Sequence, residues 1–152
     1  MIDFRKATAL FGGAFDPVHA GHLHVAREVS RLKPDVEQLV FVPAWRSPGK
    51  PPPAAPAADR LHWLELAVRG TPFLVWSWEL QRHHESFTVE TLKEAHRLGA
   101  VKKRLFLVLG GDAYESFERW KNPGHIRELC RLLVAHRSGA PFLAKDPEDV
   151  LL

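Results

Sequence analysis

The sequence predicts an α/β fold: a single doubly wound, Rossmann-like domain over residues 1–152, with a parallel sheet of about five strands. Short runs of five or six mostly apolar residues alternate along the chain with segments that have helical spacing. Continuous apolar runs are typical of strands covered on both faces, as in parallel sheets. The length of 152 residues, with 45% hydrophobic and 26% charged residues, fits one globular domain.

Five apolar runs predict the strands of this sheet. They cover residues 7–11, 38–42, 73–77, 104–109 and 131–135. The first run is followed by Gly12-Gly13 and the second by Pro43, and both residue types are common where a strand gives way to a turn.

Helical spacing predicts the elements between the strands. The expected helices cover residues 21–32 and 60–69, a segment that ends at residue 98, and shorter stretches near 113–119 and 125–128. Asp59 is the expected N-cap of the second helix, and Ser86 or Thr88 that of the third. Gly70 and Gly99 follow the ends of these two helices, where glycine is favoured.

A proline-rich segment separates the second strand from the second helix. Residues 43–58 contain six prolines and one glycine, which excludes regular structure and predicts a long surface loop. Compact domains seldom keep such a loop without a use for it, so we expect a mobile loop at a ligand site. In parallel sheets, ligands bind beyond the carboxyl ends of the strands. The segments expected at that edge are residues 12–20, 43–58, 78–87 and 110–120.

Composition narrows the classes of function. The only cysteine, Cys130, excludes an intrachain disulfide and lies in an apolar run, where it is expected to be a small buried hydrophobe. The N-terminus has no secretory signal pattern, and no run approaches the ~20 apolar residues needed to span a membrane. We therefore expect a cytoplasmic protein without a membrane partner. The net charge is +3 and the only basic run of three is Lys102-Lys103-Arg104, which favours a small anionic ligand over a nucleic acid.

Residues 11–24, FGGAFDPVHAGHLH, carry the strongest chemical signal. Gly12 and Gly13 directly follow the first strand, where glycine lets backbone N–H groups approach a phosphate closely. His19 and His22 lie at the start of the first helix, whose N-terminus attracts anions. Two imidazoles at that place would donate hydrogen bonds to phosphate oxygens. The pattern predicts phosphoryl-centred chemistry, in which positioning and charge stabilisation do most of the catalysis.

Other phosphate- and metal-binding motifs fit this segment poorly. A dinucleotide fingerprint would need a third glycine, and Asp35 matches its expected acidic residue only weakly. A Walker loop would need a Gly-Lys-Ser/Thr sequence, which does not follow. A metal site built from His19, His22 and His24 would have only Asp16 nearby and no cysteine, so we expect no metal bound by protein ligands alone.

The segment GGAFDPVHAGHL resembles the signature of the bacterial nicotinate-nucleotide adenylyltransferases, and HAGH resembles the HxGH element of nucleotidyltransferases in general. The resemblance runs from about Thr8 to Arg137. The later segments that carry it include Arg60, Glu79, Arg82, Ser86-Phe87-Thr88, Thr91-Leu92, Gly110, Asp112, Phe117 and Trp120. Pantetheine-phosphate adenylyltransferases and cytidylyltransferases share the first motif, but the later segments favour the nicotinate family. Gly49 stands where this family has His, and Phe87 where it has Tyr.

The resemblance implies adenylyl transfer from ATP to nicotinate mononucleotide, giving deamido-NAD and pyrophosphate, with Mg²⁺ accompanying ATP. It implies catalytic roles for His19, His22 and Lys50. It places ATP against Gly12, Gly13, Phe15, His19, His22, Gly110 and Asp112, and the mononucleotide against Ser86, Phe87, Thr88 and Trp120. Simpler interpretations also remain open for three of these: a solvated charge for Lys50, a core residue for Trp120 and a helix cap for Thr88.

Members of the resembled family continue to an Ile-Ser-Ser-Thr-x-x-Arg element whose Ser and Arg hold ATP phosphates. No such string occurs in these 152 residues, so we expect this chain to bind the mononucleotide better than it handles ATP. Arg46 and Arg137 are the candidates to supply phosphate contacts in its place. Two alternative functions stay open: a shortened relative that binds a pyridine nucleotide without efficient catalysis, and a nucleotidyltransferase with another phosphate-bearing acceptor.

Overall fold

The computed structural model describes residues 2–135 and 143–152, and its centre is one parallel sheet. Its six strands are β1 (Thr8–Gly13), β2 (Gln38–Pro43), β3 (Leu74–Val75), β4 (Leu105–Gly110), β5 (Arg131–Ala135) and β6 (Val150–Leu151). They lie in the order β3-β2-β1-β4-β5-β6, and every neighbouring pair is parallel. The predicted doubly wound sheet is thus confirmed, with β6 added at one edge. The chain reverses direction across the sheet between β1 and β4, the point where ligands bind in such folds.

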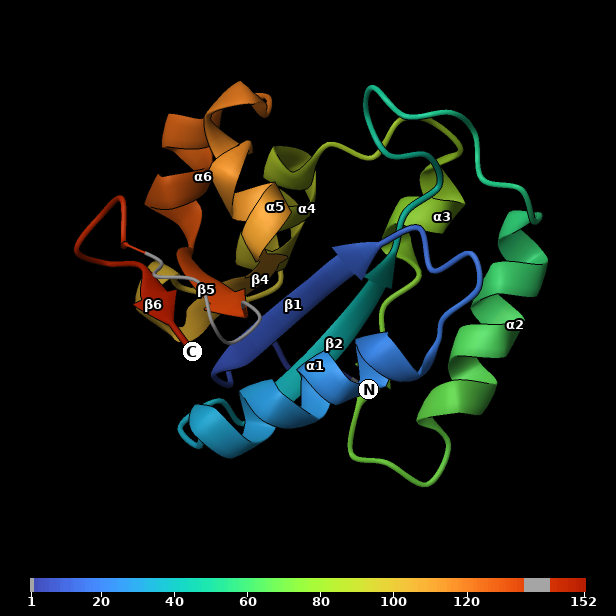
Figure 1. Ribbon diagram of the computed structural model, residues 1–152, viewed down its shortest axis with the longest axis horizontal. Helices are drawn as coiled ribbons and strands as arrows, with labels where there is room; N and C mark the ends of the chain where they lie inside the picture. Colours follow the sequence, from blue (N-terminus) through green and yellow to red (C-terminus); the bar gives the residue numbers. More distant parts are fainter. Residues whose placement is uncertain (1, 136–142) are drawn as a thin grey trace.

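Helices cover both faces of the sheet (Figure 1). They are α1 (Ala20–Leu32), α2 (Ala57–Val68), α3 (Trp78–Arg82), α4 (Thr88–Arg97), α5 (Gly111–Glu115) and α6 (Pro123–Leu129), with 3-10 turns at Lys102–Arg104 and Phe117–Arg119. In the part of the chain that the structure describes, no helix is long and apolar enough to cross a membrane.

The core has two halves because successive strand residues point to opposite faces. Leu10, on one face of β1, packs in a cluster that includes Leu92 of α4 and Ile126 of α6. Its neighbour Ala9 belongs to the other cluster, which includes Val29 of α1 and Leu64 of α2. Residues on both faces of the central strands are buried, which explains why these strands appear in the sequence as continuous apolar runs.

Helix α1 begins where the sequence predicted, with His19 as its N-cap and His22 in its first turn. The predicted caps of two later helices are wrong. Helix α2 begins at Ala57, so Asp59 lies within its first turn, where a carboxylate still favours the helix dipole. Helix α4 has Phe87 at its N-cap position and no side-chain cap hydrogen bond.

Two elements have no counterpart in the prediction. Helix α3 has five residues, too few for helical periodicity to be visible in the sequence. Strand β6 has two residues and pairs with β5 through Val150 and Leu151. The segment from residue 44 to residue 56 contains neither helix nor strand, as its prolines predicted.

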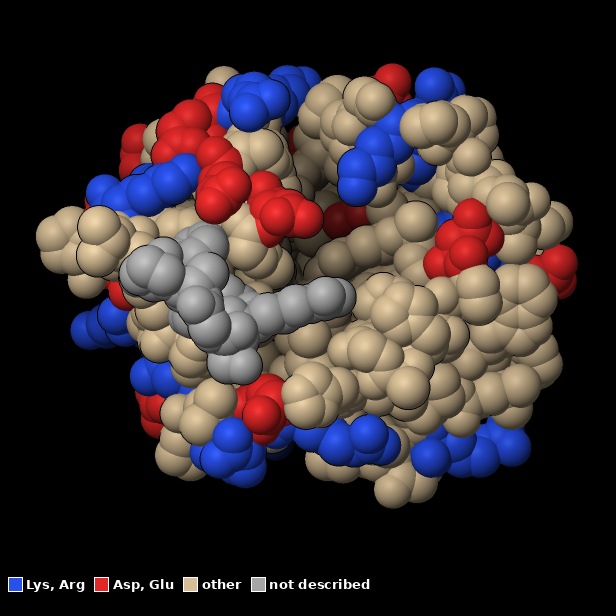
Figure 2. All heavy atoms as spheres, viewed as in Figure 1, with Lys and Arg blue, Asp and Glu red and all other residues tan. Residues whose placement is uncertain are grey.

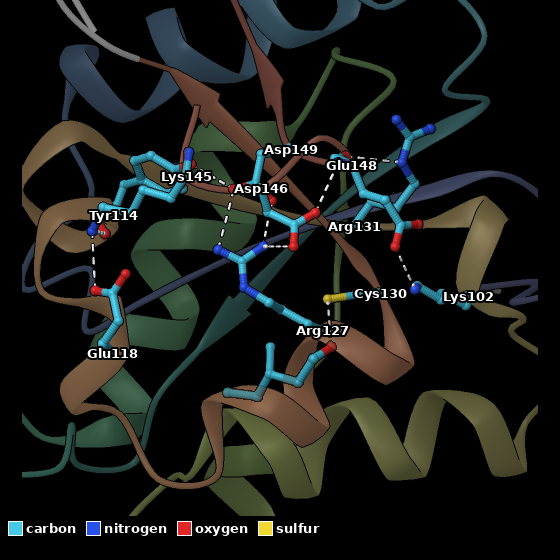
Figure 3. Close-up of polar contacts among 11 residues, drawn as sticks. Lys102, Tyr114, Glu118, Arg127, Cys130, Arg131, Lys145, Asp146, Glu148 and Asp149 are labelled. Carbon is cyan, nitrogen blue, oxygen red and sulfur yellow. Dashed lines mark hydrogen bonds and ion pairs between the residues drawn. The ribbon is translucent and has the colours of Figure 1, made fainter. Parts of the chain in front are cut away.

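The chain before β6 is fixed by a polar cluster on α5 and α6 (Figure 3). The Asp149 carboxylate accepts hydrogen bonds from the Tyr114 hydroxyl at 2.5 Å and from the Arg127 guanidinium at 2.6 Å. Lys145 donates from its backbone N–H to the Tyr114 hydroxyl at 2.7 Å and from its ammonium to the Tyr114 carbonyl at 2.8 Å. These contacts hold the last strand against the edge of the sheet. Nearby Cys130 is 2% exposed, and burial raises its thiol pKa to about 12, which confirms it as a buried hydrophobe.

Candidate functional site

The carboxyl ends of β1 and β4 lie side by side at the centre of the sheet. Their register pairs Leu10 with Leu107, so Gly13 and Gly110 end the two strands at the same level. Figure 2 shows a hollow in the surface above this edge, with basic side chains on one rim and acidic side chains on the opposite rim. The first-turn motif and the segment after β4 therefore meet at one place, as the parallel topology requires.

Two histidines cap the N-terminus of α1 by accepting hydrogen bonds from backbone N–H groups of the first turn. The Nδ1 atom of His19 accepts a hydrogen bond from the Gly21 N–H at 3.0 Å. The Nδ1 atom of His22 accepts one from the His19 N–H at 3.1 Å. The two rings stack with their centroids 3.8 Å apart and their planes 21° from parallel. This is a capping box in which imidazoles replace the usual hydroxyl and carboxylate.

This arrangement fixes the proton on each imidazole. A ring nitrogen that accepts a hydrogen bond carries no hydrogen, so a neutral His19 or His22 bears its proton on Nε2. Stacking then places two Nε2–H donors next to each other at the end of a helix, facing away from the backbone they cap. Such a pair suits the adjacent oxygens of a phosphate group.

Gly21 is required between the histidines because there is no room for a side chain. A Cβ atom at this position would lie 2.9 Å from Cε1 and 3.0 Å from Nδ1 of His19. The glycine in HAGH therefore lets the imidazole fold back over the first turn of the helix. The sequence motif predicted the location of the histidines, and the structure supplies the reason for the residue between them.

The environment of His22 keeps its ring neutral. Burial, and to a lesser extent the neighbouring charge of His19, lowers the pKa of His22 to about 4. The rings of Phe15 and Phe11 pack edge-on against it, with centroids at 4.9 and 6.2 Å. Phe15 is 3% exposed, so its ring supports His22 from beneath and presents little surface to a ligand. Near pH 7, His22 is a hydrogen-bond donor without a charge of its own.

Asp16 and Arg60 join the first turn to the proline-rich loop. The Asp16 carboxylate accepts hydrogen bonds from the backbone N–H groups of Ala54 at 2.6 Å and Ala55 at 3.0 Å. Arg60, on α2, is 1% exposed and donates to four backbone carbonyls. These acceptors are Ala14 at 2.7 Å, Ala44 at 2.8 Å, Ala55 at 3.1 Å and Trp45 at 3.2 Å. One buried guanidinium thus holds the loops that follow β1 and β2.

The sequence pattern did not predict that Arg60 holds these loops. Arg60 was expected only as part of the family resemblance. The role could have been inferred from its position, because Arg60 lies four residues before Leu64 and therefore on the buried face of α2. A charge on a buried helix face needs several hydrogen-bond partners, and loop carbonyls are the ones available.

The segment from Ser86 to Thr88 leads into α4. The Ser86 hydroxyl oxygen accepts a hydrogen bond from the Trp45 N–H at 3.0 Å, and the Ser86 N–H donates to the Arg46 carbonyl at 2.9 Å. Ser86 is therefore occupied with contacts to the proline-rich loop. Thr88 is the first residue of α4, and its N–H has no acceptor among the residues that the structure describes. The Phe87 ring is covered by the Lys121 ammonium, 4.2 Å from the ring centroid.

The remaining predicted residues lie around the same edge. Gly110 is exposed at the N-cap position of α5, and Asp112 is exposed in that helix's first turn. Trp120 is half-buried and packs on Phe117 with ring centroids 5.4 Å apart. Exposed side chains on the proline-rich loop include Arg46 and Lys50, whereas Arg137 lies outside the described residues.

Comparison with known proteins identifies the family of the chain. The cytidylyltransferase-like family model matches residues 10–150. A probable nicotinate-nucleotide adenylyltransferase of Aquifex aeolicus is 39% identical over 132 residues, which are 86% of this chain and 77% of that protein. A probable nicotinate-nucleotide adenylyltransferase of Pseudomonas fluorescens is 37% identical over 147 residues, which are 96% of this chain and 67% of that protein. The chain thus spans about two thirds to three quarters of the length of these relatives.

Solved structures share the fold. Plasmodium falciparum nicotinic acid mononucleotide adenylyltransferase complexed with NaAD superimposes with a TM-score of 0.76 at 17% identity, covering 97% of this chain and 74% of that one. At this identity the likeness supports the architecture alone, while the sequence matches carry the family. The chain belongs to the cytidylyltransferase-like family and, within it, to the nicotinate-nucleotide adenylyltransferases.

Proposed function

We propose that this chain transfers the adenylyl group of ATP to nicotinate mononucleotide, giving deamido-NAD and pyrophosphate. The observation that carries the proposal is the stacked pair of imidazoles at the N-terminus of α1, whose Nε2 atoms have no hydrogen-bond partner among the described residues. A phosphate oxygen of the mononucleotide attacks the α-phosphorus of ATP. The bond from that phosphorus to the bridging oxygen breaks, and pyrophosphate leaves with the electron pair.

The two histidines would stabilise the charge that grows on the phosphate oxygens during this exchange. Because His22 is neutral near pH 7, its hydrogen bond strengthens as negative charge develops, which lowers the barrier more than it tightens ground-state binding. Lys50 and Arg46, on the loop after β2, would add positive charge on the pyrophosphate side. The reaction requires no covalent enzyme intermediate, since both substrates bring their own phosphates.

The adenosine half would bind over the ends of β1 and β4. Gly12, Gly13 and Gly110 leave the backbone accessible there, and a Cβ at Gly110 would meet no atom within 4 Å. Asp112, exposed next to them, would accept hydrogen bonds from the nucleoside. Phe15 would contribute to this half indirectly, because its ring packs against His22.

The mononucleotide half would bind between α4 and the segment after α5. The unpaired N–H of Thr88 at the start of α4 offers a hydrogen bond to the nicotinate carboxylate, with the helix dipole adding to the attraction. The half-buried ring of Trp120 offers a flat surface for the pyridine ring. Phe87 and Ser86 would shape this turn.

Mg²⁺ would enter with ATP. Among the described residues no group of three or more His, Cys, Asp or Glu side chains is placed to hold a metal ion. In such reactions Mg²⁺ keeps several waters and binds mainly through substrate phosphates. The ion would supply neutralising charge to the triphosphate, while the protein's own donors orient it.

The first test is synthesis of deamido-NAD by the purified chain from ATP and nicotinate mononucleotide, with nicotinamide mononucleotide as the competing acceptor. We expect turnover with the nicotinate substrate and weaker use of the amide, because an amide presents one acceptor and an unwanted donor to the Thr88 N–H. Equal use of both would contradict the assignment of the acceptor. Calorimetric binding of nicotinate mononucleotide without turnover would instead support the alternative of a binding protein.

The second test is His22→Ala. Loss of one such donor typically lowers kcat by about 10²–10³-fold, and nicotinate mononucleotide affinity should change far less. His24→Ala is the matched control, because His24 is exposed on the same helix and forms no part of the cap. A His22→Ala protein that retains most of its turnover would disprove the role assigned to this ring.

A further inference from the structure

A buried carboxylic acid lies next to the segment that leads into α4, and it has no role in the proposed reaction. Glu79, in α3, is 9% exposed. Its Oε2 atom accepts a hydrogen bond from the Thr91 hydroxyl of α4 at 2.6 Å. Ser86 lines the same small cavity, and its hydroxyl is near enough to oppose the rise of the Glu79 pKa. Hydroxyls from two different segments therefore lie next to one carboxyl group.

The Ser86 hydroxyl extends this link to the proline-rich loop. Its oxygen accepts from the Trp45 N–H at 3.0 Å, which leaves its single hydrogen available to the nearby Glu79 carboxyl group. The neighbouring Ser86 N–H donates to the Arg46 carbonyl at 2.9 Å. A series of polar contacts thus runs from the loop after β2, through Ser86, to Glu79 and Thr91.

The donor and acceptor roles in these contacts depend on whether Glu79 is ionised. An ionised carboxylate only accepts, so it satisfies both hydroxyls; a protonated acid must donate one hydrogen and loses part of its acceptor capacity. Protonation of the acid would allow the Ser86 hydroxyl to reorient, and we expect its hydrogen bond with the Trp45 N–H to weaken as a result.

We propose that Glu79 is a positioning residue that fixes the Ser86–Thr88 segment to the proline-rich loop and so couples the mononucleotide half of the site to the phosphate half. The expected effect on mononucleotide binding rests on the proposed function, whereas the contacts of Glu79 and Ser86 are independent of it. Glu79 touches no substrate, and it acts through Ser86 on the one side and Thr91 on the other.

Other charges near Glu79 are accounted for. Arg82 of α3 pairs with Glu90 of α4 at 3.0 Å, and His84 and Glu85 lie in the segment between the two helices. Burial raises the pKa of Glu79 to about 7, against the opposing influence of the two hydroxyls and Arg82. The ordinary value is 4.5. Because its pKa is higher in the folded protein, Glu79 contributes most to the free energy of unfolding below pH 4.5, and this contribution is lost as the pH rises to about 7. Over the same range a growing fraction of Glu79 is ionised and accepts hydrogen bonds with both oxygens.

The ligand-free test measures hydrogen exchange of the Trp45 and Ser86 backbone amides at pH 8 by NMR. In Glu79→Gln we expect both amides to exchange about tenfold faster, because one carboxylate oxygen is replaced by an NH₂ group, which donates hydrogen bonds and cannot accept one from a hydroxyl. Glu90→Gln is the matched control, since Glu90 lies in the same cluster but bonds neither hydroxyl. Unchanged exchange in Glu79→Gln, or equal acceleration in the control, would overturn the proposal.

Ser86→Ala provides a second route should Glu79→Gln fold poorly. It removes the same link from the other end, so Trp45 exchange should accelerate to a similar extent. In the double variant the two effects should not add, because both substitutions break one chain. Additive effects would show that Glu79 and Ser86 act separately, which contradicts the proposal.

The functional test is calorimetric binding of nicotinate mononucleotide from pH 6 to pH 8. Relative to Glu79→Gln, the wild-type affinity should rise by about fivefold or more over this range, and the variant should show a raised KM with kcat within about twofold. Comparison with the variant cancels titration of the ligand's own phosphate. A pH profile identical in both proteins would overturn the coupling. If neither protein binds the mononucleotide while the exchange result holds, the proposed function fails and the positioning role of Glu79 stands.

Discussion

At the scale of single residues, the site depends on how two imidazoles are held. His19 and His22 use their Nδ1 atoms to cap the helix that carries them, so each ring is fixed in orientation and tautomer before any ligand arrives. Preorganised donors cost little reorganisation when charge develops on a phosphate. The low pKa of His22 follows from the same packing, because the Phe15 ring that fixes it also removes water from it.

The contact between Gly21 and His19 gives a prediction at this scale. In Gly21→Ala the new Cβ would lie 2.9 Å from the His19 ring and force the imidazole to move. A displacement of about 1 Å can cost about 100-fold in rate, so we expect kcat for deamido-NAD synthesis to fall by that factor. The higher helix propensity of alanine, worth about 0.5–1 kcal/mol, should keep the free energy of unfolding near its original value.

Gly124→Ala is the control for this experiment. Gly124 also lies in the first turn of a helix, α6, and a Cβ there would meet no atom within 4 Å. Urea unfolding should show equal or higher stability for this variant, and turnover should be unchanged. Full activity in Gly21→Ala would mean that the His19 ring does not need its present position.

At the scale of elements, the loops after β1 and β2 are held by α2 through one buried side chain. Arg60 supplies the donors for carbonyls of Ala14, Ala44, Trp45 and Ala55, groups that would otherwise be left without partners at a strand end. Asp16 performs the complementary task for two N–H groups. The segment between β2 and α2 lacks helix and strand, yet its two ends are fixed by side chains of neighbouring elements.

Substitution of Arg60 should therefore affect stability and the site together. In Arg60→Met the carbonyls lose their donors, and we expect the free energy of unfolding, measured with urea, to fall by about 3 kcal/mol or more. Trp45 and Ala55 should also become more accessible to exchange and proteolysis. Arg69→Met, an exposed arginine at the end of the same helix, should change stability by less than about 0.5 kcal/mol. Similar effects for the two substitutions would contradict the role of Arg60.

At the scale of the whole molecule, the candidate site draws on residues from both sides of the sheet's midpoint. The first turn and the proline-rich loop belong to the β1–β2–β3 side, while Gly110 and Trp120 belong to the β4–β5–β6 side. Both sides must be fixed relative to the sheet for the halves to meet. On the second side this task falls to the cluster around Asp149, which joins β6, α5 and α6 (Figure 3).

The cluster provides the prediction at this scale. The Asp149 side chain is 1% exposed, and it accepts from Tyr114 and Arg127, which are 35 and 22 residues away in the sequence. Asp149→Asn leaves the Arg127 charge without its main partner, so the free energy of unfolding should fall by about 3 kcal/mol. Glu148→Gln removes only an exposed pair with Lys102 and should cost less than about 1 kcal/mol. Equal losses in the two variants, measured by urea unfolding, would show that the cluster contributes no more than a surface pair.

The sequence by itself determined the parts of this protein that depend on local pattern. Continuous apolar runs gave the positions of β1, β2, β4 and β5 to within two residues at each end, because strands buried on both faces leave that mark on the sequence. The first-turn motif located His19 and His22 at the start of α1, since the helical spacing of apolar residues begins directly after it.

Tertiary structure alone decided what depends on contacts between distant segments. The sequence does not reveal that Ser86 is held by Trp45 and lies next to Glu79, or that Arg60 serves the carbonyl of Ala14, 46 residues away. Nor does it reveal the short elements α3 and β6, which have too few residues for a periodic pattern; β6 is defined by its pairing with β5. Buried polar groups form hydrogen bonds with the groups that the folded chain places next to them, and these groups can be far away in the sequence.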